Sequence, residues 1–419
     1  MTGHDVIVVG GGLAGLSCAV RLHESGRAVH LVEASDQVGG RVRTDKLDGF
    51  LLDRGFQVML DAYPIAGEML DLEALDLRPY LPGALIRKDE RFFRLMDVFR
   101  HPLALGETVL QPIGTLRDKL LVGRLRLSLL TASEESIWRN FAEEPTESFL
   151  RRYGFSEDFI DAFFRGFYGG IFLERELVTS ARFFAFTFRL FGKGKATLPN
   201  RGMEEIPRQL AARLPPDAIR CGSAVENIED DGTLRLRDGS PQRAAELVIA
   251  TDGATAHHLL PEIAPPTWQS TVNLYFRAKE PPLSEPIIAL AGYRTGLVHN
   301  VSVPNLVAPG YAAGRDALVS VSVLGSVAQA ESGEFLRAVR SELGEWFGPA
   351  ASDWEHLRSY PIARALPSPV AGHDRSGFHH PRPGIRVCGD HCLSGSIEGA
   401  IRSGLAAAED ILSSSHDRR

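Results

Sequence analysis

Apolar and polar positions divide the chain into short apolar runs and longer amphipathic stretches. The segment 5–9 is apolar after its first residue, and Leu13, Leu16 and Val20 follow near the helical period of 3.6 residues. A second strand-like segment, 29–33, comes next and ends at Glu33. This pattern predicts a buried strand, a helix and a second buried strand at the start of the chain.

Later parts of the chain repeat the pattern. Asp238-Gly239 lies between alternating apolar and polar residues and predicts a hairpin turn. A helix with one apolar side is expected from about Ile397. The other elements expected here are a helix at 202–214 and strands at 223–228, 247–250 and 385–388.

Two intervening stretches have a different character. Residues 76–195 are expected to be mostly helical, whereas 256–376 combines strand-like runs at 272–276 and 318–324 with an amphipathic helix at 333–347. These stretches should form a second domain, with 76–195 as its helical part. The first domain would then consist of 1–75, 196–255 and 377–419.

Glycines after the first strand point to a dinucleotide. Gly10 permits a tight turn, Gly12 lets the backbone approach a pyrophosphate, and Gly15 lets the helix pack closely on the strand. Glu33 ends the second strand, about twenty residues on, where an acid takes ribose hydroxyls. The Gly39-Gly40-Arg41 turn that follows is typical of FAD sites rather than NAD sites.

These motifs predict an α/β fold: a Rossmann-like FAD-binding domain assembled from discontinuous segments, plus an α+β substrate domain with a helical part. A second GxGxxG motif is absent from the sequence. We therefore expect the organic substrate itself to reduce the flavin, and another acceptor to reoxidise it.

Composition narrows the partners and the location. The net charge of −7 argues against nucleic acid as the main partner. The first strand starts almost at residue 1, no apolar run is long enough to span a membrane, and the four cysteines are scattered, so a cytoplasmic location is expected. Cys388 and Cys392 have no matching ligand pair elsewhere, so we expect free thiols and no metal site. The oligomeric state stays open.

Two local biases each allow two interpretations. Eleven of the 22 phenylalanines fall between Phe155 and Phe191, which fits either an apolar tunnel or entrance for a substrate, or else a helical core or a subunit contact. The stretch 87–126 has nine Lys or Arg against five Asp or Glu, interleaved with apolar residues. It fits either a helix on a membrane surface or a solvated face.

The chain resembles the FAD-dependent amine oxidase superfamily, which includes amine oxidases, protoporphyrinogen oxidases and carotenoid desaturases. Five blocks carry the resemblance in order along nearly the whole chain. They are 10–15 with Glu33, 39–41, 199–203, 248–251, and Gly389-Asp390 with 396–400.

The resemblance implies roles for individual residues. Arg41 would lie near the FAD phosphates, the backbone of Val225 at the adenine, and Asp390 at the ribityl or phosphate region. Ile397 would begin a helix whose N-terminal N–H groups face the flavin ring and stabilise negative charge there. Together, the motifs and the resemblance predict non-covalent FAD held by Gly10, Gly12, Leu13, Ala14, Gly15, Glu33, Ala34, Gly39, Gly40, Arg41, Gly55, Phe56, Val225, Thr251, Gly389, Asp390, Ser396, Ile397 and Ala400.

Departures from the family pattern bear on the substrate. Ser396 stands where amine oxidases often have a cage tyrosine, and Asn273 stands where a gapless alignment places their lysine. Both argue against ordinary amine oxidation. The segments around Gly55 and Tyr63 are similar to plant-type carotenoid desaturases, although Gln57 stands where that branch commonly has histidine.

The expected activity is a two-electron dehydrogenation or desaturation of an apolar organic substrate, desaturase-like or protoporphyrinogen-oxidase-like. Such chemistry can proceed without a side-chain acid or base, so no catalytic residue is assigned. His391 and Cys392 should lie beside the flavin, and a covalent thioether at Cys392 is an alternative. Amine oxidation, flavin-dependent isomerisation and a non-catalytic carrier of the same fold are the rival functions, and peripheral membrane contact is a further expectation.

Overall fold

A parallel sheet forms the centre of one half of the molecule. The computed structural model describes residues 4–292, 296–368 and 377–416. β1 lies between β2 and β14, with Val8 opposite both Leu31 and Val248. The sheet order is β10 (Ile219–Arg220), β2 (Val29–Val32), β1 (His4–Val9), β14 (Ala244–Ile249), β21 (Ile385–Cys388) and β20 (Phe378–Arg382), with β20 antiparallel to β21.

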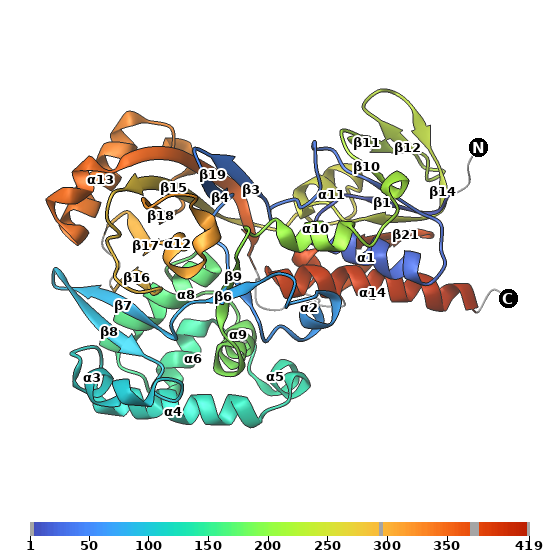
Figure 1. Cartoon of the computed structure of the whole chain (residues 1–419). Coiled ribbons are helices and arrows are strands. Elements are labelled where there is room, and N and C mark those ends of the chain that lie inside the picture. Colours follow the sequence, from blue (N-terminus) through green and yellow to red (C-terminus); the bar gives the residue numbers. More distant parts are fainter. Residues whose placement is uncertain (1–3, 293–295, 369–376, 417–419) are drawn as a thin grey trace.

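Both faces of this sheet are covered, which explains why its strands are apolar runs. Val6 and Val8 face helices α1 (Leu13–Glu24) and α14 (Ile397–His416), which lie side by side in Figure 1. Ile7 and Val9 pack on the opposite face against a small antiparallel sheet and helix α11. That cover consists of β11 (Val225–Ile228), β12 (Leu234–Leu236), β13 (Pro241–Gln242) and α11 (Gly253–Leu259).

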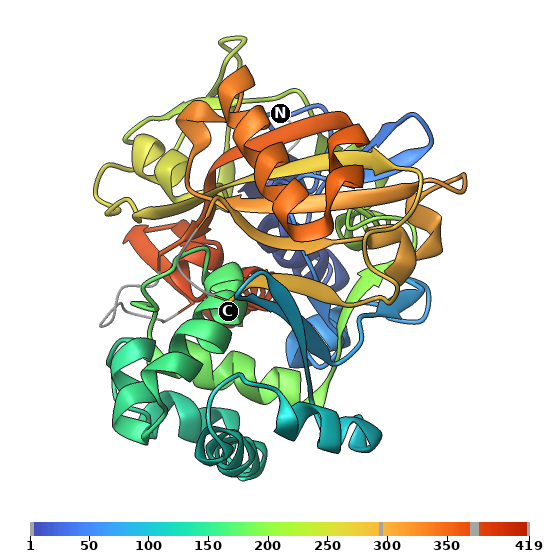
Figure 2. The same cartoon turned by 90° about the vertical axis from the view of Figure 1, so that its left-hand side faces the viewer.

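A mixed seven-stranded sheet forms the other half. Helix α13 (Gly333–Phe347) lies across its outer face, where Phe335, Val339 and Leu343 join the strand core (Figure 2). The strand order is β19 (Glu355–Pro367), β15 (Trp268–Ala278), β18 (Ala317–Leu324), β17 (Val298–Ser302), β16 (Ile288–Ala291), β7 (Gly83–Lys88) and β8 (Arg91–Met96).

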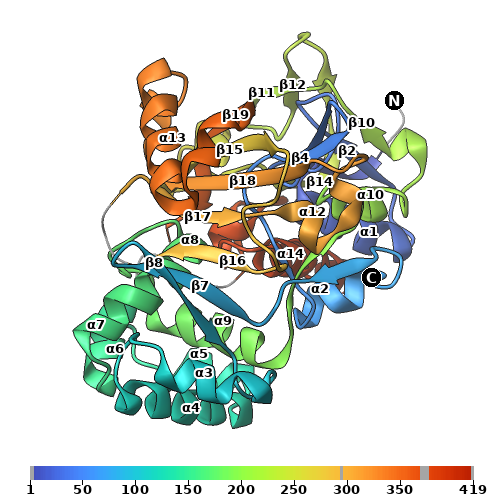
Figure 3. The same cartoon turned by 60° about the vertical axis from the view of Figure 1, so that its left-hand side comes forward.

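A layer of helices lies below this sheet, next to the β7–β8 hairpin (Figure 3). One π-helical turn, Ile160–Phe164, interrupts the layer. The helices are α3 (Leu105–Leu110), α4 (Leu116–Thr131), α5 (Glu134–Asn140), α6 (Thr146–Tyr153), α7 (Glu157–Phe159), α8 (Arg165–Phe172) and α9 (Ala181–Lys193).

Short elements connect the two halves. They are β3 (Thr44–Leu47) with β4 (Phe50–Asp53), the sheet of β5 (Met59–Leu60), β9 (Ala196–Pro199) and β6 (Leu77–Pro79), and the helices α2 (Pro64–Met69), α10 (Glu205–Ala211) and α12 (Pro304–Val307).

The predicted α/β class and the principal strands and helices are confirmed. The prediction that residues 76–195 are mostly helical is wrong at its start, because β6, β7 and β8 occupy much of 77–96. The hairpin is held by long-range pairing: β7 runs parallel to β16, with Leu85 opposite Ala289. No local pattern in the sequence could reveal that partner. The division of the chain into two domains at the stated boundaries stays a prediction.

Candidate cofactor and substrate cavity

One cavity of about 1320 Å³ runs from the glycine turn after β1 to the outer helices α3 and α4. It opens at the carboxyl ends of the parallel strands, where α/β sheets bind ligands. Its volume exceeds the roughly 300–1,000 Å³ of a pocket for one drug-sized molecule. The cavity is therefore large enough to hold a dinucleotide and a second organic molecule.

All but one of the predicted cofactor-binding residues line this cavity. Gly15 lies behind the wall, where a Cβ would come within 1.9 Å of the Gly10 carbonyl oxygen, so its role is close helix packing. The lining residues are Gly10, Gly12, Leu13, Ala14, Glu33, Ala34, Gly39, Gly40, Arg41, Gly55, Phe56, Val225, Thr251, Gly389, Asp390, Ser396, Ile397 and Ala400.

The glycine turn leaves room for a phosphate. Gly10 has a φ of +109°, and a Cβ there would lie 2.7 Å from the Ala250 carbonyl oxygen. Gly12 differs, because a Cβ on it would have no neighbour within 4 Å. Gly12 is also the N-cap of α1 and makes no side-chain capping bond, so the first N–H groups of the helix remain available to an anion. This open cradle fits a pyrophosphate.

Glu33 is anchored beside the turn. Its Oε2 accepts a hydrogen bond from the Gly11 N–H at 2.6 Å, and its Oε1 accepts from the N–H and hydroxyl of Ser35 at 2.8 and 2.7 Å. These bonds fix the carboxylate against the glycine turn while the residue still lines the cavity. This position suits recognition of ribose hydroxyls.

The second glycine turn packs directly on the first. The Gly39 N–H donates to the Gly11 carbonyl at 2.8 Å, and a Cβ on Gly40 would lie 3.3 Å from the Gly12 Cα. Gly39 and Gly40 have φ angles of +119° and +58°, in the region that favours glycine. The two motifs therefore form one continuous backbone surface.

Arg41 and Asp390 form an ion pair on the wall of the cavity. The Arg41 Nη2 donates to Asp390 Oδ1 at 2.6 Å, and its Nη1 donates to the Ala365 carbonyl at 2.9 Å. The guanidinium also lies over the ring of Trp268, 5.6 Å from its centroid. The resemblance assigned separate roles to the two charged residues, whereas the structure joins them in one unit at the cavity wall.

The start of α14 contributes the facing wall. The Ser396 hydroxyl accepts from the Gly399 N–H at 2.9 Å and thereby caps the helix. The Ser403 hydroxyl accepts from the Gly389 N–H at 2.8 Å, which fixes the preceding turn to the helix. Because α14 is 20 residues long, its N-terminus can favour negative charge in the cavity.

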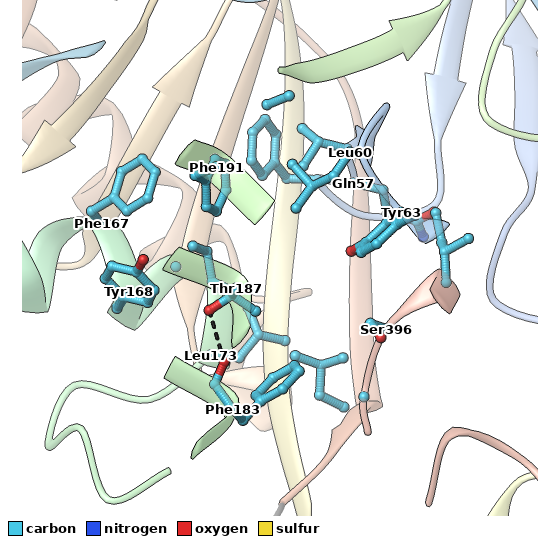
Figure 4. A pocket seen from close by; sticks show the side chains of 18 of the residues that line it. Gln57, Leu60, Tyr63, Phe167, Tyr168, Leu173, Phe183, Thr187, Phe191 and Ser396 are labelled. Atoms are coloured by element: carbon cyan, nitrogen blue, oxygen red, sulfur yellow. Dashed lines mark hydrogen bonds between the residues drawn. The ribbon is translucent and has the colours of Figure 1, made fainter. Parts of the chain in front are cut away.

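Aromatic side chains line the end of the cavity beyond the glycine turns. Figure 4 shows Phe167, Tyr168 and Phe183 on one side and Tyr63 and Ser396 on the other. The phenylalanine-rich segment contributes both to the cavity wall and to the core, since five of its eleven phenylalanines pack away from the cavity in the buried core. The six that line the cavity are Phe159, Phe163, Phe167, Phe183, Phe188 and Phe191.

The polar groups between these walls are neutral, whereas charged side chains such as Asp97, Lys119 and Arg126 line the outer part of this end. Gln57 donates from Nε2 to the Arg41 carbonyl at 2.8 Å, while its buried Oε1 has no partner among the residues that the structure describes. Burial raises the pKa of Tyr63 well above its ordinary value, so its hydroxyl stays protonated. Thr187 donates to the Phe183 carbonyl at 2.9 Å (Figure 4). This end of the cavity therefore suits an apolar molecule.

Three residues singled out from the sequence lie outside the cavity wall. Asn273 is buried in β15, where it bonds Ser320 at 3.2 Å and Ser322 at 3.1 Å, and Ser322 is the residue that reaches the cavity. His391 and Cys392 are buried just behind Asp390, and burial raises the pKa of the Cys392 thiol.

Sequence reasoning missed the part of the wall that β19 and β15 supply. Ala365 and Trp268 hold Arg41, and Thr271 and Ile362 line the cavity. No motif marks these residues, because they reach the site through strand pairing. Residues 355–367 mix charged, polar and apolar side chains, so their pattern does not identify the face that turns to the cavity.

Comparison with known proteins supports this picture. Residues 13–412 match the family described as flavin containing amine oxidoreductase. Protoporphyrinogen oxidase 2, chloroplastic/mitochondrial, of Arabidopsis thaliana is 28% identical over 178 residues, which are 41% of this chain and 33% of that protein. The match thus spans about a third of the length of that relative.

Solved structures share the fold over the whole chain. An oxidoreductase from Methanosarcina mazei superimposes with a TM-score of 0.76 at 17% identity, covering 96% of this chain and 99% of its own. Cyclohexylamine oxidase from Brevibacterium oxydans IH-35A gives a TM-score of 0.74 at 18% identity, covering 99% and 100%. At these identities the likeness establishes the fold alone.

Proposed function

The chain belongs to the flavin-containing amine oxidoreductase family, and we propose that it binds FAD non-covalently and dehydrogenates an apolar organic substrate. The observation that carries the proposal is the single cavity, which has a phosphate cradle at one end and aromatic walls at the other. The family relationship establishes a flavin oxidoreductase. The choice of FAD and of an apolar substrate is our inference from the cavity.

The cofactor end supports FAD. The anchored carboxylate of Glu33, the two joined glycine turns and the Arg41–Asp390 pair all line the wall. In FAD the ribose, the pyrophosphate and the ribityl chain follow one another, and they offer partners to these three groups respectively. Cys392 supports non-covalent binding, because its thiol is buried behind Asp390 and donates to the Val387 carbonyl at 3.7 Å.

The substrate end supports an apolar molecule. Six phenylalanines of the segment 155–191 line it, and Ser396 stands where amine oxidases often have a cage tyrosine. The acidic side chain at the outer part of this end, Asp97, is held by Arg126 at 2.6 Å. It is therefore neutralised rather than free to attract a cationic amine.

The chemistry that FAD supplies when bound is acceptance of two electrons as a hydride equivalent. The polypeptide positions the substrate and excludes water from it. Phe163 and Phe167 exclude water from one side, and Gln57 and Tyr63 offer neutral hydrogen-bonding groups on the other. The N-terminus of α14 stabilises the negative charge that arrives with the electron pair. The substrate also loses one proton, which passes to solvent, and no side chain is assigned as its acceptor.

Two measurements on the purified protein test this proposal. Denaturation should release a free flavin that chromatography identifies as FAD, and a flavin retained on the polypeptide would contradict non-covalent binding. An anaerobic screen should then show flavin bleaching by porphyrinogens or polyenes rather than by small polar amines and amino acids. Bleaching by small amines alone would establish amine oxidation instead, and a protein that takes up no flavin would establish a carrier.

A further inference from the structure

Exposed leucines surround the outer mouth of the cavity. We define the leucine rim as Leu103, Leu105, Leu110, Leu116, Leu120 and Leu127, which are exposed by 95, 52, 83, 60, 68 and 67%. They lie on and beside α3 and α4, which form the lowest layer of the molecule in Figure 1. Large exposed apolar patches of this kind mark interaction surfaces.

The three rim leucines on α4 form one ordered face of that helix and are not exposed at scattered positions. At about 100° per residue, Leu116, Leu120 and Leu127 fall within about 40° of one another on the helix. Leu125 and Leu129 point the opposite way and are buried in the core. The helix therefore has two apolar faces, and the fold covers only one of them.

The rim is continuous with the cavity. Leu105, Leu116 and Leu120 line the outer end of the cavity, whereas Leu103, Leu110 and Leu127 stand around it. Lys119 holds α3 and α4 together at this point, donating to the carbonyls of Val109 and Gln111 at 2.7 and 2.8 Å. A molecule seated on the rim would close the mouth of the cavity.

Basic side chains flank the rim. Arg117 and Arg124 lie on one side of the leucine face of α4, and Lys119 and Arg126, which is paired with Asp97, lie on the other. Residues 99–131 contain five Lys or Arg against two Asp or Glu, in a chain whose net charge is −7. One of the two acids, Asp118, is buried and accepts hydrogen bonds from Thr115 and Ser156. The local charge is thus opposite to that of the whole molecule.

We propose that the leucine rim seats the protein on an anionic lipid surface, with the cavity opening into the acyl region. Leucines on one face with arginines at its borders are the composition of a helix that lies in a membrane interface. The basic border favours an anionic headgroup over a zwitterionic one. No helix in the described parts of the chain is long and apolar enough to cross a bilayer, and the contact proposed here is peripheral. This membrane contact does not depend on the reaction proposed above.

Vesicle co-sedimentation of the flavin-loaded protein tests the proposal. Wild type should bind vesicles of phosphatidylglycerol and phosphatidylcholine at least tenfold more tightly than vesicles of phosphatidylcholine alone. The triple variant L103S/L110S/L127S, which spares the cavity wall, should lose at least tenfold in binding, and so should R117E/R124E. Matched controls are V178S, at an exposed apolar residue elsewhere, and R237E, at an exposed arginine of the β12 hairpin.

The melting temperature and flavin spectrum of each variant must match wild type, which shows that the fold is intact. Binding that survives both rim variants, or that falls equally in V178S and R237E, would overturn the proposal. Equal binding to neutral vesicles would overturn the anionic surface as the partner. A wild-type dimer that the rim variants dissociate, with no vesicle binding, would assign the rim to a second copy of the chain.

Discussion

Gly12 and Gly15 are close neighbours in one turn, but a methyl group would affect them differently. A Cβ on Gly12 meets nothing within 4 Å, whereas a Cβ on Gly15 would lie 1.9 Å from the Gly10 carbonyl oxygen. We expect Gly12→Ala to leave the melting temperature of the flavin-free protein unchanged and to weaken FAD binding at least tenfold, because the methyl group projects into the phosphate cradle. Gly15→Ala should lower that melting temperature. Fluorescence titration with FAD and thermal unfolding measure both effects, and unchanged FAD affinity in Gly12→Ala would contradict the site.

Asp53 is a buried carboxylate on which several elements converge. It accepts from the hydroxyls of Thr44 and Tyr311, both at 2.5 Å, and from the Met203 N–H at 3.0 Å. Burial outweighs these bonds and raises the pKa of Asp53 from 3.8 to about 6. Since the folded state holds this proton more tightly than the unfolded chain, the group stabilises the fold most at low pH.

That stabilisation should be lost as the pH rises from about 4 to about 6, by about 3 kcal/mol for a shift of about two units. Asp53→Asn removes the titrating group and should flatten this part of the stability curve. Urea unfolding of both proteins across this pH window measures the effect. Parallel curves for the two proteins would show that Asp53 titrates normally.

The residues of the proposed phosphate cradle could be predicted because they lie close together in the sequence. Gly10, Gly12 and Glu33 occupy one strand–helix–strand unit, and the spacing alone fixes their relation. The partners of Arg41 could not be predicted in this way. Ala365 and Trp268 meet it only because β19 pairs with β15, and Trp268 itself is opposite Pro367 in that pairing.

At the scale of elements, α14 holds the short helix α2 in place. α2 has no side-chain cap of its own, and Glu398 of α14 accepts from the N–H groups of Ile65 and Ala66 at 3.1 and 2.9 Å. Glu398 is 1% exposed, so its carboxylate is committed to this contact and to Arg402. The contact fixes Tyr63, the residue just before α2, at the cavity.

Glu398→Gln should therefore lower the free energy of unfolding by about 1–3 kcal/mol, because one buried donor loses its charged acceptor. Glu409→Gln on the same helix is the matched control, since that carboxylate pairs with Arg21 at the surface and should change stability by no more than about 0.5 kcal/mol. Urea unfolding compares the two variants. Equal changes in the two variants would mean that the contact between Glu398 and α2 adds nothing to the free energy of unfolding.

Elements with a clear apolar pattern of their own can be predicted, including strands with remote partners such as β14 and β21. The helix Gly333–Phe347 follows from its own periodicity. The hairpin of β7 and β8 does not, because β7 is held by β16, far along the sequence. Its apolar residues precede a mostly helical stretch, and no local pattern separates them from it.

At the scale of the whole molecule, the cavity lies where the parallel sheet, the seven-stranded sheet and the helical layer meet. The glycine turns come from the first, Thr271 and Asn300 from the second, and Phe163 and Phe167 from the third. This arrangement separates the two tasks of the site. The proposed phosphate cradle is visible in the sequence, whereas the wall proposed to meet the substrate is assembled only by folding.

An anaerobic titration of the flavin with its reducing substrate tests the central claim most directly. The absorbance of oxidised flavin and the yield of product are measured together until bleaching is complete. The account predicts one molecule of dehydrogenated apolar product for each flavin bleached, because the substrate alone supplies the electron pair. Conversion of substrate to an isomer with the flavin still oxidised, or bleaching by small polar amines alone, would contradict it.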